Sequence, residues 1–462
     1  MKKTVRLLGV LLIALLLPMM FACTDKANDP NKKMETEDFD LGGRTVYIGH
    51  WSDLAPAEGT AMYEDYSALI KSLEEKYHCK IEFVHAGGDW STWGNQILVT
   101  ALSNEKIADT FWYTMENLVP QWVNAGILMP LDGVFDFNDK DVWNIPASEQ
   151  YKLNGKHYAI TSWPDALGHV ILFNKRIVEE NGITSESLYK LVEDGEWTWD
   201  KMVELAKKCT KNTEDSDPNN DTWGFGAYAS ACPSAEPFIY SNGTTPVKQD
   251  GNQKLTYNLD DPAAVEAIDF CHKLVYDYKV VNVKELSWGY SEGLWKKGKV
   301  AFFECPSWAD LQGYKEMLEN DEFGFLLLPK GPKAKDYVNA QSAAAGLFMQ
   351  KDTPDAKAIA QIMAEIEKPY EWKTNIPNWR NYESFVSDKG SLNIIKMIAG
   401  RSVSIIGGNA TWFRDNVLWN DWGIPGKIPA KTYVETNKAP SQKSFDDLWS
   451  AELTVPEEEP AQ

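Results

Sequence analysis

Apolar and polar residues alternate between two spacings along the first third of the chain, and this pattern predicts strands and helices in turn. Runs of β-branched and aromatic residues predict strands, and apolar residues three and four positions apart predict helices. The predicted strands cover 45–51, 80–84 and 108–113, and the predicted helices cover 62–77, 93–102 and 118–125. Strands that alternate with helices predict an α/β fold, whose ligand crevice lies at the carboxyl ends of the strands.

Aromatic and hydrogen-bonding residues follow each of these three predicted strands. In chain order they are Trp51, Ser52 and Asp53, then Asp89, Trp90 and Trp93, then Trp112, Tyr113 and Glu116. A sugar ring offers an apolar face that stacks on an aromatic ring and hydroxyls that need hydrogen-bond partners. Packing in the core is the competing explanation for any single tryptophan. Repetition of the pattern at three strand ends favours a ligand site.

The first 23 residues resemble a bacterial lipoprotein signal. Lys2, Lys3 and Arg6 precede an apolar segment, and Cys23 follows the small residue Ala22. The apolar segment, about a dozen residues, is shorter than the roughly 20 that a membrane span needs. We therefore expect residues 1–22 to be a signal peptide and Cys23 to carry lipid such as palmitate. The alternative is a plain secretory signal, cleaved without lipidation.

The chain that follows is acidic and long. Removal of residues 1–22 takes the formal charge from −21 to −24, which disfavours nucleic acid and anionic lipid and suits neutral or cationic ligands. The polar residues 23–40 predict a flexible tether. From Cys23 on there are 440 residues, enough for two lobes.

Five cysteines remain besides Cys23, at positions 79, 209, 232, 271 and 305. They include no CxxC pair and no metal-ligand spacing, and an odd number cannot pair completely within one chain. We expect buried free thiols.

Several segments in order resemble the extracellular solute-binding proteins of ABC importers, specifically the family-1, sugar-binding branch typified by maltose-binding protein. The segments are 107–112 (IADTFW), 122–132 (WVNAGILMPLD), 154–160 (NGKHYAI), 197–202 (WTWDKM), 298–303 (GKVAFF), 328–332 (LPKGP) and 352–358 (DTPDAKA). The resemblance spans nearly all of residues 41–450. It rests on the order and spacing of the segments together, since none is diagnostic alone.

The resemblance implies a two-lobe periplasmic-binding-protein type II fold with ligand in the cleft between the lobes. The N-terminal lobe would take 41–161 plus 329–368, and the C-terminal lobe 168–325 plus 371–455. The hinge would lie at 161–168 and around 326–328. Closure of such a hinge on ligand is the event that an importer detects.

The same resemblance assigns ligand contacts residue by residue. It implies an aromatic platform at Trp112, a carboxylate at Glu116, hinge-side contacts at Trp163 and Asp165, and the indole of the second lobe at Trp308. Trp51 and Asp53 match the first loop. Looser matches are Tyr240, Asn242 and Trp412. His169 departs from the family pattern, which often has a small or apolar residue there, and is the one histidine expected to touch ligand.

An acidic run suggests a calcium site. Asp215, Asp217, Asn219 and Asp221 place oxygens at alternating positions, as at the start of a calcium loop. Position 6, however, is Asn220 rather than glycine, and position 12 is Gly226 rather than Glu. A turn rich in Asp and Asn explains the same composition without an ion.

The sequence gives little support to a catalytic motif. Residues 293–300 nearly spell a P-loop, but Val300 stands where a hydroxyl residue would hold magnesium, and a helix ending at Gly298 before a strand explains the segment. HExxH does not occur, and GxSxG occurs once, at 289–293 (GYSEG), where it leads into the helix that ends at Gly298. An exported glycoside hydrolase remains an alternative, because Asp53, Glu116, Asp165 and Glu304 could supply the two carboxylates it needs. A receptor for a non-sugar solute and a tethered adhesin are further alternatives.

The sequence therefore predicts a binding protein rather than an enzyme, lipid-anchored at the extracellular face of the bacterial cell membrane. It would act as a monomer, bind an oligosaccharide without a required cofactor, and deliver it to separate ABC permease subunits.

Overall fold

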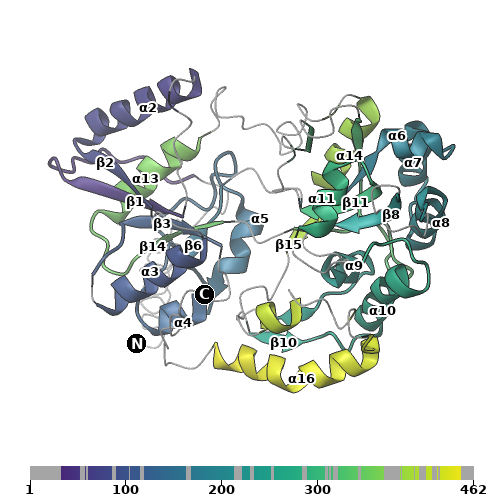
Figure 1. Ribbon diagram of the computed structural model, residues 1–462. Helices are drawn as coiled ribbons and strands as arrows, with labels where there is room; N and C mark the ends of the chain where they lie inside the picture. The colour runs from purple at the N-terminus through teal and green to yellow at the C-terminus, as the bar shows by residue number, and fades with distance from the viewer. Residues whose placement is uncertain are drawn as a thin grey trace, which may run out of the picture.

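Two lobes lie side by side in the computed structural model of this protein (Figure 1). The structure describes residues 33–51, 58, 61–85, 90–103, 105–114, 119–162, 168–212, 221–228, 234–250, 254–283, 289–306, 311, 314–315, 321–341, 345–368, 386, 388–399, 401–404, 413–418, 424 and 427–448. Each lobe is built on its own sheet.

The first lobe contains a five-stranded sheet in the order β2-β1-β3-β14-β6. Its strands are β1 (Thr45–His50), β2 (Lys80–His85), β3 (Thr110–Tyr113), β6 (Ala159–Ile160) and β14 (Gly346–Met349). Its helices are α2 (Ala61–Tyr77), α3 (Trp90–Leu102), α4 (Val119–Asn124), α5 (Ile145–Ser148), the 3-10 turn η2 (Glu149–Tyr151) and α13 (Ala356–Glu367), with the small pair β4 (Lys152–Leu153) and β5 (Lys156–His157). The strands β1, β2 and β3 are parallel, and β14 runs antiparallel to β3 and β6.

Alternation along the strands of this sheet divides its apolar side chains between two cores. Trp112, Leu347 and Met349 belong to one core, whereas Phe111 and Phe348 belong to the other. Successive side chains of a strand point to opposite faces, so a sheet covered by helices on both faces needs apolar residues at every position. All four residues of β3 are buried, as this requires.

The second lobe contains a four-stranded sheet in the order β12-β7-β11-β8. Its strands are β7 (His169–Asn174), β8 (Trp223–Ala227), β11 (Val300–Pro306) and β12 (Phe323–Leu326), with the two-stranded sheets β9 (Val247–Gln249) with β10 (Leu255–Tyr257), and β13 (Asn339–Gln341) with β15 (Ser402–Ser404). Its helices are α6 (Lys175–Glu180), α7 (Ser185–Glu193), α8 (Trp199–Cys209), α9 (Ala235–Ser241), α10 (Pro262–Tyr276), α11 (Tyr290–Lys296), α14 (Lys389–Ala399), the π-helical turn η5 (Arg414–Leu418) and α16 (Ala430–Asp447).

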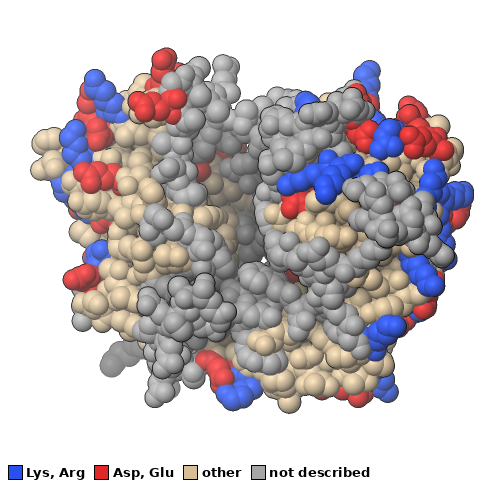
Figure 2. All heavy atoms as spheres, viewed as in Figure 1, with Lys and Arg blue, Asp and Glu red and all other residues tan. Residues whose placement is uncertain are grey.

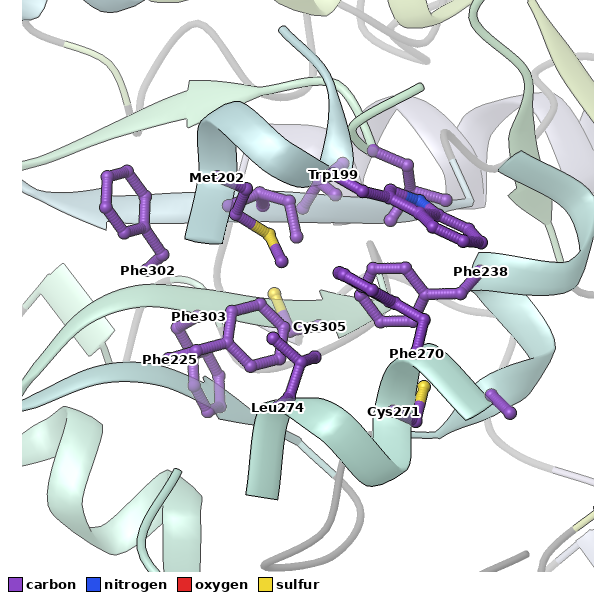
Figure 3. Close-up of a cluster of buried hydrophobic side chains, with 14 of the residues drawn as sticks. Trp199, Met202, Phe225, Phe238, Phe270, Cys271, Leu274, Phe302, Phe303 and Cys305 are labelled. Atoms are coloured by element: carbon purple, nitrogen blue, oxygen red, sulfur yellow. The ribbon is translucent and has the colours of Figure 1, made fainter. Parts of the chain in front are cut away.

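A large aromatic core holds the second lobe together, and Figure 3 shows part of it. Trp199 of α8 stacks on Phe270 of α10 with ring centroids 4.3 Å apart. Thr198 caps the start of α8, because its side chain accepts a hydrogen bond from the N–H of Lys201. The sulfur atoms of Cys271 and Cys305 lie in the same core.

The chain crosses between the lobes later than the sequence suggests. Leu328 is buried in the core of the second lobe, the N–H of Lys330 bonds to the carbonyl of Trp197, and Tyr337 joins the same core. The first sheet is regained only at Gly346. The predicted lobe boundary at 329 and the predicted hinge at 326–328 are therefore wrong, because the segment that leaves β12 stays hydrogen-bonded to the second lobe.

The predicted flexible tether is also shorter than expected. Lys33 Nζ lies 2.6 Å from Asp139 Oδ1 and 2.8 Å from Asp141 Oδ2, and the N–H of Met34 donates to Asp136 Oδ2. Phe39 packs on the core of the first lobe. Residues 33–40 are thus bound along this lobe, by the ion pairs of Lys33, the backbone hydrogen bond of Met34 and the packing of Phe39.

Other predictions from the sequence are confirmed. The three predicted strands correspond to β1, β2 and β3, and the three predicted helices to α2, α3 and α4. Gly298, with a φ of 65°, ends the turn between α11 and β11, as expected for the segment that resembles a P-loop. Cys79, Cys209, Cys271 and Cys305 are buried free thiols, and Cys232 lies outside the described residues. No helix in the described part of the chain is both long and apolar enough to span a membrane.

The contact between β8 and α8 gives a test of this packing. A Cβ on Gly224 would lie 2.1 Å from the backbone oxygen of Ala206, whereas a Cβ on Gly293 of α11 would meet nothing within 4 Å. We expect Gly224→Ala to destabilise the protein by about 1–3 kcal/mol, since strand and helix must separate. Gly293→Ala, the matched control, should be neutral or stabilising by up to about 1 kcal/mol. Thermal unfolding of both variants measures this, and equal melting temperatures would contradict the packing.

Candidate functional site

Aromatic rings gather where β1 and β3 of the first lobe end. Trp51 follows β1, stacks on His50 with ring centroids 3.9 Å apart, and meets Tyr113 of β3 edge-on at 6.4 Å. Because β1 and β3 are parallel, their carboxyl ends share one edge of the sheet. Gly346 pairs with Tyr113, so β14 starts at this edge too. Trp51 is only partly buried. It is therefore an aromatic surface available at this edge.

Charged side chains occupy the matching edge of the second lobe. Strands β8 and β11 are parallel and end together, and β7 runs antiparallel to β11, so that its first residue, His169, pairs with Pro306. In an antiparallel pair, residues two positions apart across the strands are diagonal neighbours on one face. His169 and Glu304 stand in that relation, and the imidazole Nδ1 of His169 is hydrogen-bonded to Glu304 Oε1.

Burial gives the pair of His169 and Glu304 an unusual electrostatic setting. Glu304 is 2% exposed, and the side chain of His169 is 16% exposed. Burial alone would lower the pKa of His169, but the charge and the hydrogen bond of Glu304 outweigh it, so the pKa is raised. The imidazolium form therefore persists to higher pH and donates Nδ1–H to the carboxylate.

A second carboxyl group, Glu236, lies in the first turn of α9, within electrostatic range of both members of this pair. It is 9% exposed, and its Oε1 is enclosed without a hydrogen-bond partner. Burial raises the pKa of Glu236 from 4.5 to about 7, a rise that His169 opposes and Glu304 reinforces. Glu236 was not among the residues predicted from the sequence. Its one available signal was a single charge in an otherwise apolar helical run, 235–241.

Three of the predicted ligand contacts have structural roles instead. Trp112 is 6% exposed and packs in the core of the first lobe, so it offers almost no face to a sugar. Tyr240 is 2% exposed within the fully buried helix α9. Asn242 is completely buried, donates to the carbonyl of Ala263 and accepts from the N–H of Lys333. We assign Trp112 and Tyr240 to core packing, and Asn242 to hydrogen bonding with buried backbone groups. The prediction differed because a pattern of residue types does not show which way a side chain points.

The other predicted contacts stay predictions. Asp53, Glu116, Trp163, Asp165, Trp308 and Trp412 lie outside the described residues, as does Cys23. In the sequence, the described residues that come closest to Asp53 and Glu116 are Trp51 and Thr114, which lie at the edge of the first sheet. Those nearest to Trp163, Asp165 and Trp308 are Ser162, Gly168 and Pro306, and His169, next to Gly168, pairs with Pro306 at the edge of the second sheet. In the sequence, these predicted contacts therefore follow β1, β3 and β11 or precede β7.

Most of the predicted calcium loop also lies outside the described residues. Asp215, Asp217 and Asn219 lie outside the described residues, and Asp221 is completely buried. Within the described ranges, no group of three or more His, Cys, Asp or Glu side chains is arranged to hold a metal ion. Calcium at this loop stays a prediction.

The arrangement is suited to binding a polar molecule between two sheet edges. One edge supplies an aromatic face, and the other supplies a carboxylate with an imidazolium and a second carboxyl group. Figure 2 shows a hollow between the two lobes on the viewed side. Two α/β lobes, joined by more than one crossing and facing each other across a hollow, define a binding protein of the periplasmic type II class.

Comparison with known proteins identifies the family. The sequence matches the bacterial extracellular solute-binding proteins over residues 57–366, more than half of the chain, and the protein belongs to this family. No curated protein matches the sequence.

Solved structures agree on the fold at low sequence identity. The GacH receptor of Streptomyces glaucescens, solved unliganded and with acarbose, has a TM-score of 0.59 and 18% identity over 88% of this chain and 99% of its own. The cyclic alpha-maltosyl-1,6-maltose binding protein of Arthrobacter globiformis has a TM-score of 0.61 and 16% identity over 88% and 99%. The maltose/maltodextrin-binding domain MalE of Bdellovibrio bacteriovorus, bound to maltotriose, has a TM-score of 0.56 and 18% identity over 87% and 99%.

The raised pKa of Glu236 predicts a pH-dependent cost to stability. Between pH 4.5 and about 7 the folded state keeps a proton that the unfolded chain has lost, so folding becomes less favourable as pH rises through this window. Glu236→Gln cannot ionise, and it should gain stability relative to the wild type, on the order of 3 kcal/mol at about pH 8.

Thermal unfolding of wild type and Glu236→Gln at about pH 5 and pH 8 measures this change. The exposed Glu179 of α6 supplies the control, Glu179→Gln, which should show no such trend. A stability difference between Glu236→Gln and wild type that is the same at both pH values would argue against a buried ionisable Glu236.

Proposed function

We propose that this protein captures a carbohydrate, most simply an oligosaccharide, between its two lobes and delivers it to an ABC importer. The observation that carries the proposal is the complementary chemistry of two sheet edges, one in each lobe. Trp51 offers a stacking face at one edge, and the partly exposed imidazolium of His169, held by the buried carboxylate of Glu304, offers a charged hydrogen-bond donor at the other. The sugars bound by the GacH receptor, by the Arthrobacter globiformis protein and by MalE support the same ligand class.

Ligand closure would provide the signal for transport. The two lobes are joined by crossings between Ile160 and His169, between Gln341 and Gly346, and between α13 and α14. Segments of this kind absorb the backbone change of a hinge. A ligand held by both edges binds the closed form better than the open one, and the permease subunits distinguish the two forms.

We assign no catalytic step to the protein. Its family is one of solute-binding proteins, and a receptor must release its cargo unchanged. The glycoside hydrolase that the sequence left open would consume the sugar, and recovery of intact ligand after binding separates the two.

We also propose that Cys23 carries the lipid that holds the protein, as a monomer, at the extracellular face of the cell membrane. The sequence around Cys23 supports this placement. Because residues 33–40 are bound to the first lobe, only residues 24–32 would form the free tether. Nine residues span at most about 30 Å when fully extended, so the first lobe would stay close to the membrane.

Ligand binding is tested by thermal shift and tryptophan fluorescence of the purified protein against mono- and oligosaccharides, with amino acids and peptides as other solutes. A sugar at a hundredfold excess over its Kd should add about 2.7 kcal/mol to the stability of the folded protein. Trp51→Ala should weaken binding by about tenfold, through loss of a stacking face.

The matched control is Tyr47→Ala. Tyr47 is an aromatic residue in the middle of β1, away from the strand end, and it is 41% exposed, so this variant should bind sugar with the affinity of wild type. A response to amino acids or peptides alone would sink the carbohydrate assignment. Cleavage of the sugar during the assay would identify a hydrolase.

Anchoring is tested by expressing wild type and Cys23→Ser in a bacterial host that processes lipoproteins. Wild type should fractionate with membranes and carry the mass of a lipid at its N-terminus, and Cys23→Ser should be released or left unprocessed. Wild type in the soluble fraction, cleaved and without lipid, would instead show a plain secretory signal.

A further inference from the structure

Glu236 is a carboxyl group that the fold leaves without a partner. It makes no hydrogen bond within the described part of the chain, its Oε1 is enclosed, and 9% of the residue remains exposed. Burying a carboxyl group without a donor costs free energy, so proteins normally pair such groups. Oε2 is not among the enclosed atoms, and part of the residue is exposed within electrostatic range of His169 and Glu304 at the edge of the second sheet. An unpaired carboxyl group that is partly exposed at a binding edge indicates that the donor comes from the ligand.

The charges around Glu236 leave an excess of negative charge. Glu304 of β11 is bound to His169 of β7, so this pair is neutral when both groups are ionised. A cation bound beside Glu236 would lower the pKa of this group again and so favour its ionised form, in which the cluster carries a net charge of −1. Beyond Glu304, Glu292 of α11 is matched by Lys296, whose Nζ lies 2.9 Å from its carboxylate. Lys296 is thus already engaged and does not compensate Glu236.

We propose that the cluster of Glu236, Glu304 and His169 binds a protonated amino group of the ligand, so that the captured carbohydrate is an amino sugar. This inference rests on the proposed function and specifies its substrate class. A protonated amine brings three N–H donors and one positive charge. A protonated amine therefore supplies the hydrogen-bond donor that Glu236 lacks, and its positive charge balances the negative charge of the ionised cluster.

Other ligand groups fit this cluster less well. A hydroxyl supplies a single donor, forms a weaker hydrogen bond than a charged donor, and gives Glu236 no charge that would favour its ionised form. A carboxylate or phosphate of the ligand would face two carboxyl groups and be repelled, although His169 alone would attract it. An N-acetylated amine keeps one N–H but loses the charge and adds bulk. The structure therefore favours a free amine over its acetylated form.

The test compares two ligands that differ only in acetylation. Titration calorimetry at about pH 7 would measure the affinity of the glucosamine trisaccharide and of the N-acetylglucosamine trisaccharide, with maltotriose as a neutral sugar without nitrogen. For wild type, the free amine should bind at least about tenfold more tightly than the acetylated form, as expected for a charge-assisted contact. In Glu236→Gln that preference should fall to nearly equal affinity, whereas Glu179→Gln should retain it.

Each outcome separates this inference from the proposed function. Equal affinity of wild type for both glucosamine-based ligands overturns the inference, as does a preference that survives Glu236→Gln. Binding of maltotriose with no gain from an amine overturns it too, while the carbohydrate receptor stands. Silence toward every sugar contradicts the proposed function and the inference together. If Glu236→Gln fails to fold, the wild-type comparison decides alone.

Discussion

The register of β7 against β11 is the constraint on which the second lobe and its binding edge depend. It places His169 opposite Pro306 and makes Glu304 its diagonal neighbour. A slip of one residue would turn every side chain of β7 to the other face, and it would break the hydrogen bonds of the buried Asn174 amide, which donates to Asp321 and accepts from the N–H of Ile177. The same strand begins where the chain arrives from the first lobe, so the register fixes the crossing and the charged pair at once. In the first lobe, the pairing of Gly346 with Tyr113 fixes where β14 begins, at the edge of the sheet where β3 ends.

Function at this edge is gained at some cost in stability. The core of the second lobe is dense in aromatic rings, such as Trp199 on Phe270 and Trp295 on Phe303, and it supports three ionisable groups that do not help folding equally. Glu304 is compensated by His169, whereas Glu236 is not. Local departures of this kind from satisfied burial are expected at binding sites, because the ligand completes what the fold leaves open.

Much of the fold follows from the sequence, and less of the site does. Hydrophobic spacing located β1 to α4, and Gly298 marked the turn before β11. The boundary at 329 was misplaced because the hydrogen bonds of Lys330 and Gly331 to the second lobe leave no trace in residue type. Trp112 and Asn242 were expected to face ligand for a related reason: side-chain direction depends on strand register and helix packing. Glu236 could be recognised only once the fold brought the first turn of α9 within electrostatic range of His169 and Glu304.

The central claim is that both sheet edges hold one ligand, and hydrogen–deuterium exchange with and without a bound sugar tests it most directly. The account predicts slower amide exchange in both lobes when sugar is bound. The protected peptides should be those from the carboxyl ends of β1 and β3 in the first lobe, and those from β7, from α9 and from β11 in the second. The back of each lobe, including α2 and α10, should exchange as before. Protection confined to one lobe, or centred on an outer face, would contradict a shared site between the lobes.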